Sequence, residues 1–273
     1  MGLLDHKVCV ITGGAGSLGL ASAKQFVREG ARVMLVDLKE ADLDRAKREL
    51  NSPNVETTAA DVSQVDATRN YIDRTVAKFG KIDVLFSNAG NQGPITPTVD
   101  YPEEVFDAVM TVHVRGAFLA CKYGIPQMND GGSIIITSSV VGAMGAPGAV
   151  AYVTAKHALV GLMRTVAKET AKRGIRVNTL HPGPIDNEFQ AKIDAGIGKL
   201  AGAGLQMTLL PLRGEAENFG TFAIGAIGSA YYVGFVSGCL LGPYVILRAG
   251  HIRAFTALVA IAAAAALAHG LVP

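Results

Sequence analysis

The first two-thirds of the chain alternate between short apolar runs rich in β-branched residues and longer amphipathic stretches. This alternation extends from Lys7 to about Gly183. A buried strand followed by an amphipathic helix is the repeating unit of a parallel sheet that is covered by helices on both faces. The pattern therefore predicts an α/β fold built on a doubly wound parallel sheet.

Six strands and at least four helices are predicted from this alternation. Glycines at positions 30, 80 and 174 stand where the end of a helix favours a left-handed residue. The predicted strands are Lys7–Thr12, Arg32–Asp37, Val55–Asp61, Ile82–Ala89, Gly132–Ser139 and Arg176–His181. The predicted helices include Leu18–Glu29, Gln64–Phe79, Glu103–Met128 and Ala151–Arg173.

Composition favours a protein that acts on small molecules. The formal net charge is only +2 and no long basic run occurs, which argues against nucleic acid, because phosphate binding needs clustered Lys and Arg. Cys9, Cys121 and Cys239 are far apart and form no CxxC pair, so neither a disulfide framework nor a metal site is predicted. The N-terminus lacks the apolar core of a signal peptide, so we expect a cytoplasmic protein.

The first predicted strand leads into a glycine-rich turn, Thr12–Gly19, and then into a helix. The glycines of this turn satisfy the pattern GxGxxG. Such a turn lets backbone N–H groups approach a pyrophosphate closely, and the following helix N-terminus carries partial positive charge. We expect a dinucleotide cofactor to lie against Gly13, Gly14, Gly16, Ser17, Leu18 and Gly19.

Polar residues at the ends of later strands are predicted to complete this site. Asp37 ends the second strand, where a carboxylate accepts hydrogen bonds from both ribose hydroxyls and repels a 2′-phosphate. We therefore expect NAD rather than NADP, although Lys39 weakens the preference and a solvated strand end is the alternative interpretation of Asp37. Parallel strands end at one edge of a sheet, so the site is also predicted to include Leu38, Asp61, Val62, Asn88, Ala89 and Gly90.

Tyr152 and Lys156 are four residues apart in a predicted helix, so their side chains project from one face about one turn apart. The pKa of a free tyrosine is about 10, and a neighbouring ammonium lowers it by stabilising the phenolate. Lys156 can also hydrogen-bond a nicotinamide ribose, while Ser139 can hold a substrate oxygen beside the Tyr152 hydroxyl. The spacing predicts proton transfer next to hydride transfer, although a Tyr–Lys pair alone is also common on helix surfaces.

These motifs together resemble the short-chain dehydrogenase/reductase family in order and spacing. The resemblance covers roughly the first two-thirds of the chain and rests on Thr12–Gly19, Asn88–Gly90, Ser139, Tyr152–Lys156 and Pro182–Gly183.

The resemblance implies a Rossmann-like fold and an oxidoreductase that exchanges hydride between NAD(H) and a secondary alcohol or ketone. It implies that Ser139 orients the carbonyl, that Tyr152 is the general acid/base, and that Lys156 lowers its pKa and binds ribose. Contacts of Pro182, Gly183 and Ile185 with the cofactor are also expected. So is self-association through the helices Glu103–Met128 and Ala151–Arg173.

Two residues depart from the family pattern. Ser17 replaces the second glycine of the family's TGxxxGxG turn, with Gly16 just before it. His113 occupies the position of an asparagine that supports a proton-relay water in most family members. We expect His113 either to serve a similar polar role at the catalytic site or to be a core histidine with satisfied hydrogen bonds.

The composition changes after about Asn187. No charged residue occurs between Glu217 and Arg248, and none follows Arg253. Each of these apolar segments is long enough to cross a membrane, which takes ~20 helical residues. We expect the sheet to be truncated after its sixth strand and followed by two long apolar helices, with a buried soluble helix pair as the alternative.

The tail resembles the early membrane segments of a major facilitator transporter, through Gly225–Gly234 and Arg248–Arg253. The sequence thus predicts a dehydrogenase domain over 1–190, a junction over 191–218 and an apolar, membrane-associated tail over 219–273. The second hypothesis is an inactive or membrane-tethered chimeric fusion, because the region that usually covers the substrate is replaced. A transporter is disfavoured, since two spans cannot form a bundle of repeated halves.

Overall fold

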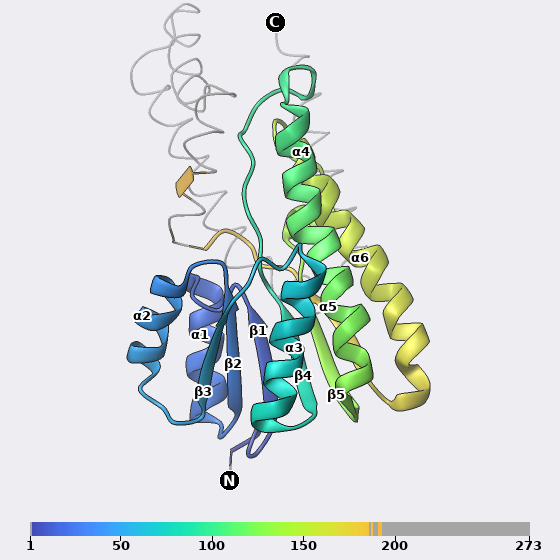
Figure 1. Cartoon of the computed structure of the whole chain (residues 1–273). Helices are drawn as coiled ribbons and strands as arrows, with labels where there is room; N and C mark the ends of the chain where they lie inside the picture. Colours follow the sequence, from blue (N-terminus) through green and yellow to red (C-terminus); the bar gives the residue numbers. More distant parts are fainter. Residues whose placement is uncertain (1, 186, 188–190, 193–273) are drawn as a thin grey trace, which may run out of the picture. The chain divides into compact units, whose positions relative to one another are not determined.

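The computed structural model describes residues 2–185, 187 and 191–192, and Figure 1 shows their arrangement. The chain divides into two units, Met1–Gly202 and Ala203–Pro273, and every described residue belongs to the first. Six parallel strands in the described part form one sheet in the order β3-β2-β1-β4-β5-β6. The order reverses between β1 and β4, which is the topology of a doubly wound sheet, so the predicted Rossmann-like fold is confirmed.

The regular elements follow the predicted alternation. The strands are β1 Val8–Thr12, β2 Arg32–Asp37, β3 Val55–Ala59, β4 Ile82–Ser87, β5 Met128–Thr137 and β6 Arg176–Leu180. The α-helices are α1 Ser17–Arg28, α2 Glu40–Leu50, α3 Val65–Phe79, α4 Glu103–Met110, α5 Gly116–Gly124 and α6 Val150–Thr170. Short turns of other types are η1 Thr98–Asp100, η2 Thr111–Arg115, η3 Ile125–Gln127, η4 Val140–Gly142 and η5 Ala171–Arg173.

The expected helix Glu103–Met128 is wrong in its interior and at its end. It consists of α4, the π-helical turn η2 and α5, and it ends at Gly124. Pro126 follows inside η3, and a proline lacks the N–H that a continuing helix needs. The strand β5 therefore starts at Met128, four residues before the expected start, and it pairs with β4 through an irregular register.

The helix α2 is absent from the sequence prediction because only two of its side chains, Leu43 and Ala46, are buried. So small an apolar stripe gives a weak periodic signal. Its charges nevertheless favour a helix, with Glu40 and Asp42 in the first turn and basic residues in the last, which complement the helix dipole.

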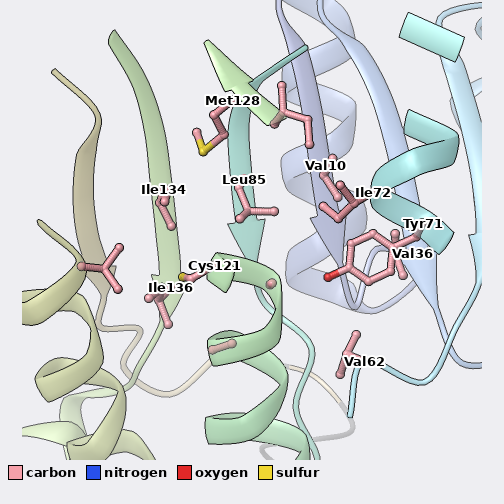
Figure 2. Close-up of a cluster of buried hydrophobic side chains, with 14 of the residues drawn as sticks. Val10, Val36, Val62, Tyr71, Ile72, Leu85, Cys121, Met128, Ile134 and Ile136 are labelled. Atoms are coloured by element: carbon pink, nitrogen blue, oxygen red, sulfur yellow. The ribbon is translucent and has the colours of Figure 1, made fainter. Parts of the chain in front are cut away.

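Alternate strand residues face two separate cores. Cys9 and Ile11 of β1 pack with α1 and α2 on one face of the sheet. Val10 faces the other side, where Figure 2 shows it in a cluster with side chains of α3 and α5. Leu159 and other residues of α6 extend this second cluster toward β5 and β6. Burial on both faces explains why the central strands β1, β2 and β4 are almost continuously apolar.

The strand register brings the predicted functional residues to one edge. Thr12 of β1 pairs with Val36 of β2, and Thr137 of β5 pairs with Leu180 of β6. These are the last residues, or nearly the last, of their strands. The loops that follow β1, β2, β4, β5 and β6 therefore all leave the carboxyl edge of the sheet, where doubly wound proteins bind their ligands.

The predicted apolar tail, 219–273, and nearly all of the predicted junction, 191–218, lie outside the described residues. In the part of the chain that the structure describes, no helix combines the length and the apolar character needed to cross a membrane. There β6 pairs only with β5 and is the last strand of the sheet.

Candidate active site

Two glycines in the loop after β1 cannot be replaced by larger residues without strain or steric overlap inside the protein. Gly13 has a φ of +64°, in the left-handed region that favours glycine. A Cβ atom on Gly19 would overlap the backbone carbonyl of Gly13. By contrast, a Cβ on Gly16 would lie 3.4 Å from the oxygen of Gly13, which is an ordinary contact. Packing in the described protein therefore leaves room for a side chain at Gly16, and its space is open to a ligand.

The N-terminus of α1 faces this loop without a capping side chain. Gly16 is the N-cap residue, it has no side chain to bond the first-turn N–H groups, and the first turn contains no acidic residue. The first N–H groups of a helix have no partner within the helix, and they attract anions. Loop and helix end therefore fit a dinucleotide pyrophosphate. Gly13, Gly14, Gly16, Ser17, Leu18 and Gly19 all lie in this segment, as the sequence predicts.

Asp37 is bonded to the loop rather than merely solvated. Its Oδ2 accepts a hydrogen bond of 3.0 Å from the backbone N–H of Ala15, and its Oδ1 accepts one of 2.8 Å from Leu38. Leu38 itself is largely exposed. The carboxylate therefore links the end of β2 to the glycine-rich loop, next to the position that a ribose would occupy in this fold.

Asn88 joins three strands. Its side-chain Nδ2 donates to the carbonyl of Thr12 at 3.2 Å, and its Oδ1 accepts from the Thr137 hydroxyl at 3.0 Å. The Thr12 hydroxyl in turn accepts the N–H groups of Asn88 and Ala89 at 3.0 and 3.1 Å. The polar atoms of the Asn88 side chain thus have a framework role, since they bind the ends of β1 and β5, while its contact with the cofactor stays a prediction.

Other predicted cofactor residues lie at the same edge. Asp61 follows β3, and its Oδ1 accepts hydrogen bonds from the N–H and the hydroxyl of Ser63 at 2.9 and 2.7 Å. Val62 beside it is buried. After β6, the carbonyl of Pro182 accepts from Val140 at 3.1 Å, which ties this loop to the segment after β5. Gly183 and the partly exposed Ile185 continue the same loop.

Ser17, the departure from the family's glycine pattern, contacts this last loop directly. The amide Nδ2 of Asn187 donates a hydrogen bond of 2.9 Å to the Ser17 hydroxyl. The two residues are 170 positions apart in the sequence. A side chain at position 17 therefore bridges the glycine-rich loop and the segment that follows β6.

The structure brings Ser139, Tyr152 and Lys156 together. Ser139 follows β5 and caps η4, while the other two residues lie in the first turns of α6. The side chains of Tyr152 and Ser139 are hydrogen-bonded. The ammonium nitrogen of Lys156 lies 5.1 Å from the centre of the Tyr152 ring and donates to the carbonyl of Thr137 at 2.7 Å.

Burial controls the charge of these groups. It raises the pKa of Tyr152 above its ordinary value of 10, and the hydrogen bond with Ser139 offsets this only in part. Burial also lowers the pKa of Lys156 to about 7. The ammonium of Lys156 lies over the ring face and binds Thr137, and its charge is not among the causes of the Tyr152 shift, so the lowering of the Tyr152 pKa by Lys156 stays a prediction.

His113 is buried in the π-helical turn η2 and is only 3% exposed. Its Nε2 lies 2.8 Å from the carbonyl oxygen and 3.2 Å from the amide nitrogen of Asn91. Burial, and then the charge of Lys156, lower the pKa of His113 to about 3. The residue does reach the catalytic group, since its ring meets that of Tyr152 edge to face at 5.6 Å.

Sequence reasoning missed several residues that hold this site. Thr12 binds Asn88, and Thr137 binds both Asn88 and Lys156. Asn91 contacts His113. His181 approaches the carbonyl of Ser139 through Nδ1 at 2.7 Å. The two threonines end strands at the edge that holds the site, and this position is the signal that could have indicated them.

Comparison with known proteins shows which family the chain belongs to. The family model described as short chain dehydrogenase matches residues 7–198. The chain belongs to the short chain dehydrogenase family. Within the residues that the structure describes, no group of three His, Cys, Asp or Glu side chains is arranged to hold a metal ion.

Members of the family with similar sequences come from plants and bacteria. The chain is 40% identical over 185 residues to short chain aldehyde dehydrogenase 1 of Euphorbia lathyris, covering 66% of this chain and 64% of that protein. It is 38% identical to levodione reductase of Leifsonia aquatica, covering 66% and 69% of the two chains. The match thus spans about two-thirds of the length of these relatives.

Solved structures of the family show the same fold. The NAD+-bound structure of xylitol dehydrogenase superposes with a TM-score of 0.66 at 38% identity, covering 68% of this chain and 74% of that one. A structure of levodione reductase gives a TM-score of 0.68 at 34% identity, covering 72% and 81% of the two chains.

Proposed function

We propose that the chain is an NAD-linked oxidoreductase that interconverts a secondary alcohol and a ketone. The observation that carries this proposal is the grouping of Ser139, Tyr152 and Lys156 at the sheet edge that also holds the uncapped N-terminus of α1. A nicotinamide ring supplies the hydride acceptor or donor when it is bound. The protein supplies the binding site for the cofactor and the proton at the substrate oxygen.

The residues of the cradle fit NAD in particular. The open space at Gly16 and the first turn of α1 would receive the pyrophosphate. Asp37 would accept the ribose hydroxyls, and its negative charge would repel the 2′-phosphate of NADP. Asp61 and Val62 line the same edge, and Lys156 would hydrogen-bond the second ribose. The NAD+-bound xylitol dehydrogenase structure supports this choice of cofactor.

Tyr152 would exchange a proton with the substrate oxygen, and Ser139 would orient that oxygen. Because burial raises the pKa of Tyr152, the phenol is protonated near neutral pH and can donate its proton to a carbonyl that is being reduced. In the direction of alcohol oxidation the phenolate must accept the proton of the alcohol. Oxidation should therefore accelerate as the pH rises toward the pKa of Tyr152.

The experiment is a screen of secondary alcohols and ketones with the full chain, followed at the absorbance band of NADH. Tyr152→Phe should lower turnover about 10³-fold, within the range for a lost general acid, and should leave NADH binding unchanged. Tyr123→Phe, at a half-buried tyrosine near the end of α5 whose hydroxyl contacts Arg69, is the matched control and should keep full activity. Undiminished turnover of Tyr152→Phe would refute the role of this residue.

A fusion without activity is the alternative function. Its motivation is the long uncharged tail, residues 218–247 and 254–273, in a chain that matches about two-thirds of its relatives' length. Fractionation separates the two ideas. Protein that stays in solution without detergent and binds NADH favours the enzyme, whereas protein that needs detergent and binds no NADH favours the fusion.

We also propose that copies of the chain associate through α4, α5 and α6. Phe118 is 46% exposed on α5, and it lines a hollow with Met110 and Val114. An exposed aromatic residue with apolar neighbours and a polar rim, here Asp107, Thr111 and Arg115, is typical of an interface. Phe118→Glu should therefore lower the mass of the particle in light scattering, and an unchanged mass would contradict this interface.

A further inference from the structure

The π-helical turn η2 places His113 at the boundary between α4 and α5. A π-helical turn widens the helix by one residue, and such turns occur frequently at functional sites. Here the turn interrupts what is otherwise one long helix, and His113 is the buried residue within it. This interruption is therefore the local feature that sets the position of the imidazole.

The imidazole ring is held from three directions. Nε2 contacts the backbone of Asn91, and a Cβ atom on Gly90 would overlap the ring, so only glycine fits there. On the third side the ring of Tyr152 packs against the imidazole at an interplanar angle of 86°. His113 thus fills the space between the turn that follows β4 and the predicted acid/base residue.

The distances indicate which nitrogen carries the proton. The Asn91 N–H can donate to an unprotonated Nε2 at 3.2 Å, but that tautomer would leave two acceptors, Nε2 and the Asn91 carbonyl oxygen, 2.8 Å apart. A protonated Nε2 instead donates to this carbonyl. The other nitrogen, Nδ1, is buried and has no hydrogen-bond partner in the described part of the chain. The hydrogen bonds that hold the ring in the described part of the chain are therefore made by Nε2.

We propose that His113 is a positioning residue, whose neutral, Nε2-protonated imidazole fixes the Gly90–Asn91 turn and orients the Tyr152 ring toward Ser139. This inference deepens the proposed function and rests on it. It is a narrower form of the first predicted alternative, a polar role at the catalytic site, and it differs from the second, because Nδ1 has no hydrogen-bond partner among the described residues.

The surrounding groups keep the ring neutral. The titratable groups against it are Tyr152 and Lys156, both of α6, while the turn after β4 contributes only backbone and an amide. On η2 itself, the guanidinium of Arg115 is bonded to the carbonyl of Ser63. Burial and the positive charge of Lys156 both oppose protonation of the imidazole. His113 should therefore hold one tautomer throughout the working pH range.

Nitrogen-15 NMR of the full chain, labelled at histidine, tests the tautomer without any turnover. The His113 signals are assigned by their loss in His113→Gln. We expect a neutral ring protonated at Nε2 over the range in which histidine ordinarily titrates, about pH 5 to 8. A proton on Nδ1, or titration within that range, would overturn the proposal. Because this measurement needs no substrate, it tests the protonation of His113 even if the chain does not catalyse the proposed reaction.

Kinetics of His113→Phe test the effect on Tyr152. Phenylalanine keeps a ring against Tyr152 but cannot donate to Asn91, so kcat should fall about tenfold to a hundredfold, with NADH affinity within about twofold of the original. The hydrogen bond with Ser139 lowers the pKa of Tyr152. If the Tyr152 ring loses its orientation, this bond weakens and the pKa of Tyr152 rises. The midpoint of the kcat profile should therefore move to higher pH.

Two further variants complete this test. His113→Gln can still donate to the carbonyl of Asn91 and should recover part of kcat. His157→Phe, at an exposed histidine of α6, the helix that carries Tyr152, is the control and should change neither kcat nor its pH profile. An unmoved midpoint in His113→Phe, or the loss of an inflection instead of its displacement, would overturn the positioning role.

Discussion

The glycine-rich loop after β1 and the start of α6 lie at the same edge of the sheet but are built in opposite ways. The loop, Thr12–Gly19, contains no ionisable side chain, and hydrogen bonds of its backbone hold it both internally, from Gly16 to Gly13 at 3.2 Å, and to the ends of neighbouring strands, as from Gly14 to Val36 at 3.0 Å. The start of α6 instead packs Tyr152 and Lys156 against His113, and burial moves the pKa of all three.

The difference shows how two kinds of function depend on the fold. A loop that binds by backbone N–H groups needs small residues, so the space around each residue decides which side chains the loop tolerates. A catalytic group needs a pKa suited to its task, and desolvation by distant segments sets that pKa. Substitutions in the loop should therefore act through shape, while substitutions around α6 should act through pH.

The largest effect is expected for Gly19→Ala. The new Cβ would overlap the Gly13 carbonyl, which belongs to the backbone and cannot rotate away. We expect the free energy of unfolding to fall by about 3 kcal/mol and NADH binding to be lost. Denaturant unfolding and NADH fluorescence measure the two quantities.

Gly16→Ala is the control for that steric argument. Its Cβ would meet only the Gly13 oxygen, at 3.4 Å, so stability should stay within about 0.5 kcal/mol of the original. NADH affinity should still fall, because the added methyl occupies space that the pyrophosphate needs. Equal losses of stability in Gly16→Ala and Gly19→Ala would break the distinction between the two positions.

A smaller effect is expected from pH acting on Lys156. Its pKa in the folded chain is about 7, well below its ordinary 10.5, so above pH 7 the unfolded chain binds more protons and stability rises with pH. Between pH 7 and about 8.5 this gain should approach 2 kcal/mol. Lys156→Met should remove it, as measured by denaturant unfolding at each pH.

The two buried thiols, Cys9 and Cys121, limit the pH range over which unfolding measurements report on Lys156. Burial raises the pKa of Cys9 and of Cys121 to about 12 from an ordinary 9, so their contribution to stability declines as the pH rises above about 9. Unfolding measured below that value isolates the lysine. A wild-type stability that does not rise over this range would contradict the lowered pKa of Lys156.

The smallest effect is expected at the bridge between Ser17 and Asn187. Loss of this exposed hydrogen bond in Ser17→Ala or in Asn187→Ala should cost about 1 kcal/mol or less. The double variant should be no less stable than either single variant, which a double-mutant cycle of unfolding free energies measures. Fully additive losses would show that the side chains act independently, and that the loop has no such link to the segment after β6.

Much of the fold can be predicted because its signals are local. The strand β2 has the predicted bounds, since its buried run is sharply delimited by Arg32 and Asp37. The π-helical turn at His113 cannot be predicted in this way. It interrupts a sequence that reads as one continuous helix, and its place depends on packing between α4, α5 and the turn after β4.

The candidate site likewise has features that the sequence reveals and features that it does not. The position of Asp37 after β2 and the four-residue spacing of Tyr152 and Lys156 are visible in the sequence, because each depends on the geometry of one element. The framework role of Asn88 is not visible, since its partners lie in β1 and β5.

The amino-acid sequence by itself determined the order of strands and helices, the glycine-rich loop and the Tyr–Lys pair. Periodicity, steric freedom and helical spacing are properties of neighbouring residues, so they can be read along the chain. Only the tertiary structure decided that the pKa of Tyr152 is raised, that the pKa of Lys156 is lowered, and that His113 is neutral. The physical reason is that the hydration lost by a charged group depends on every segment that packs around it.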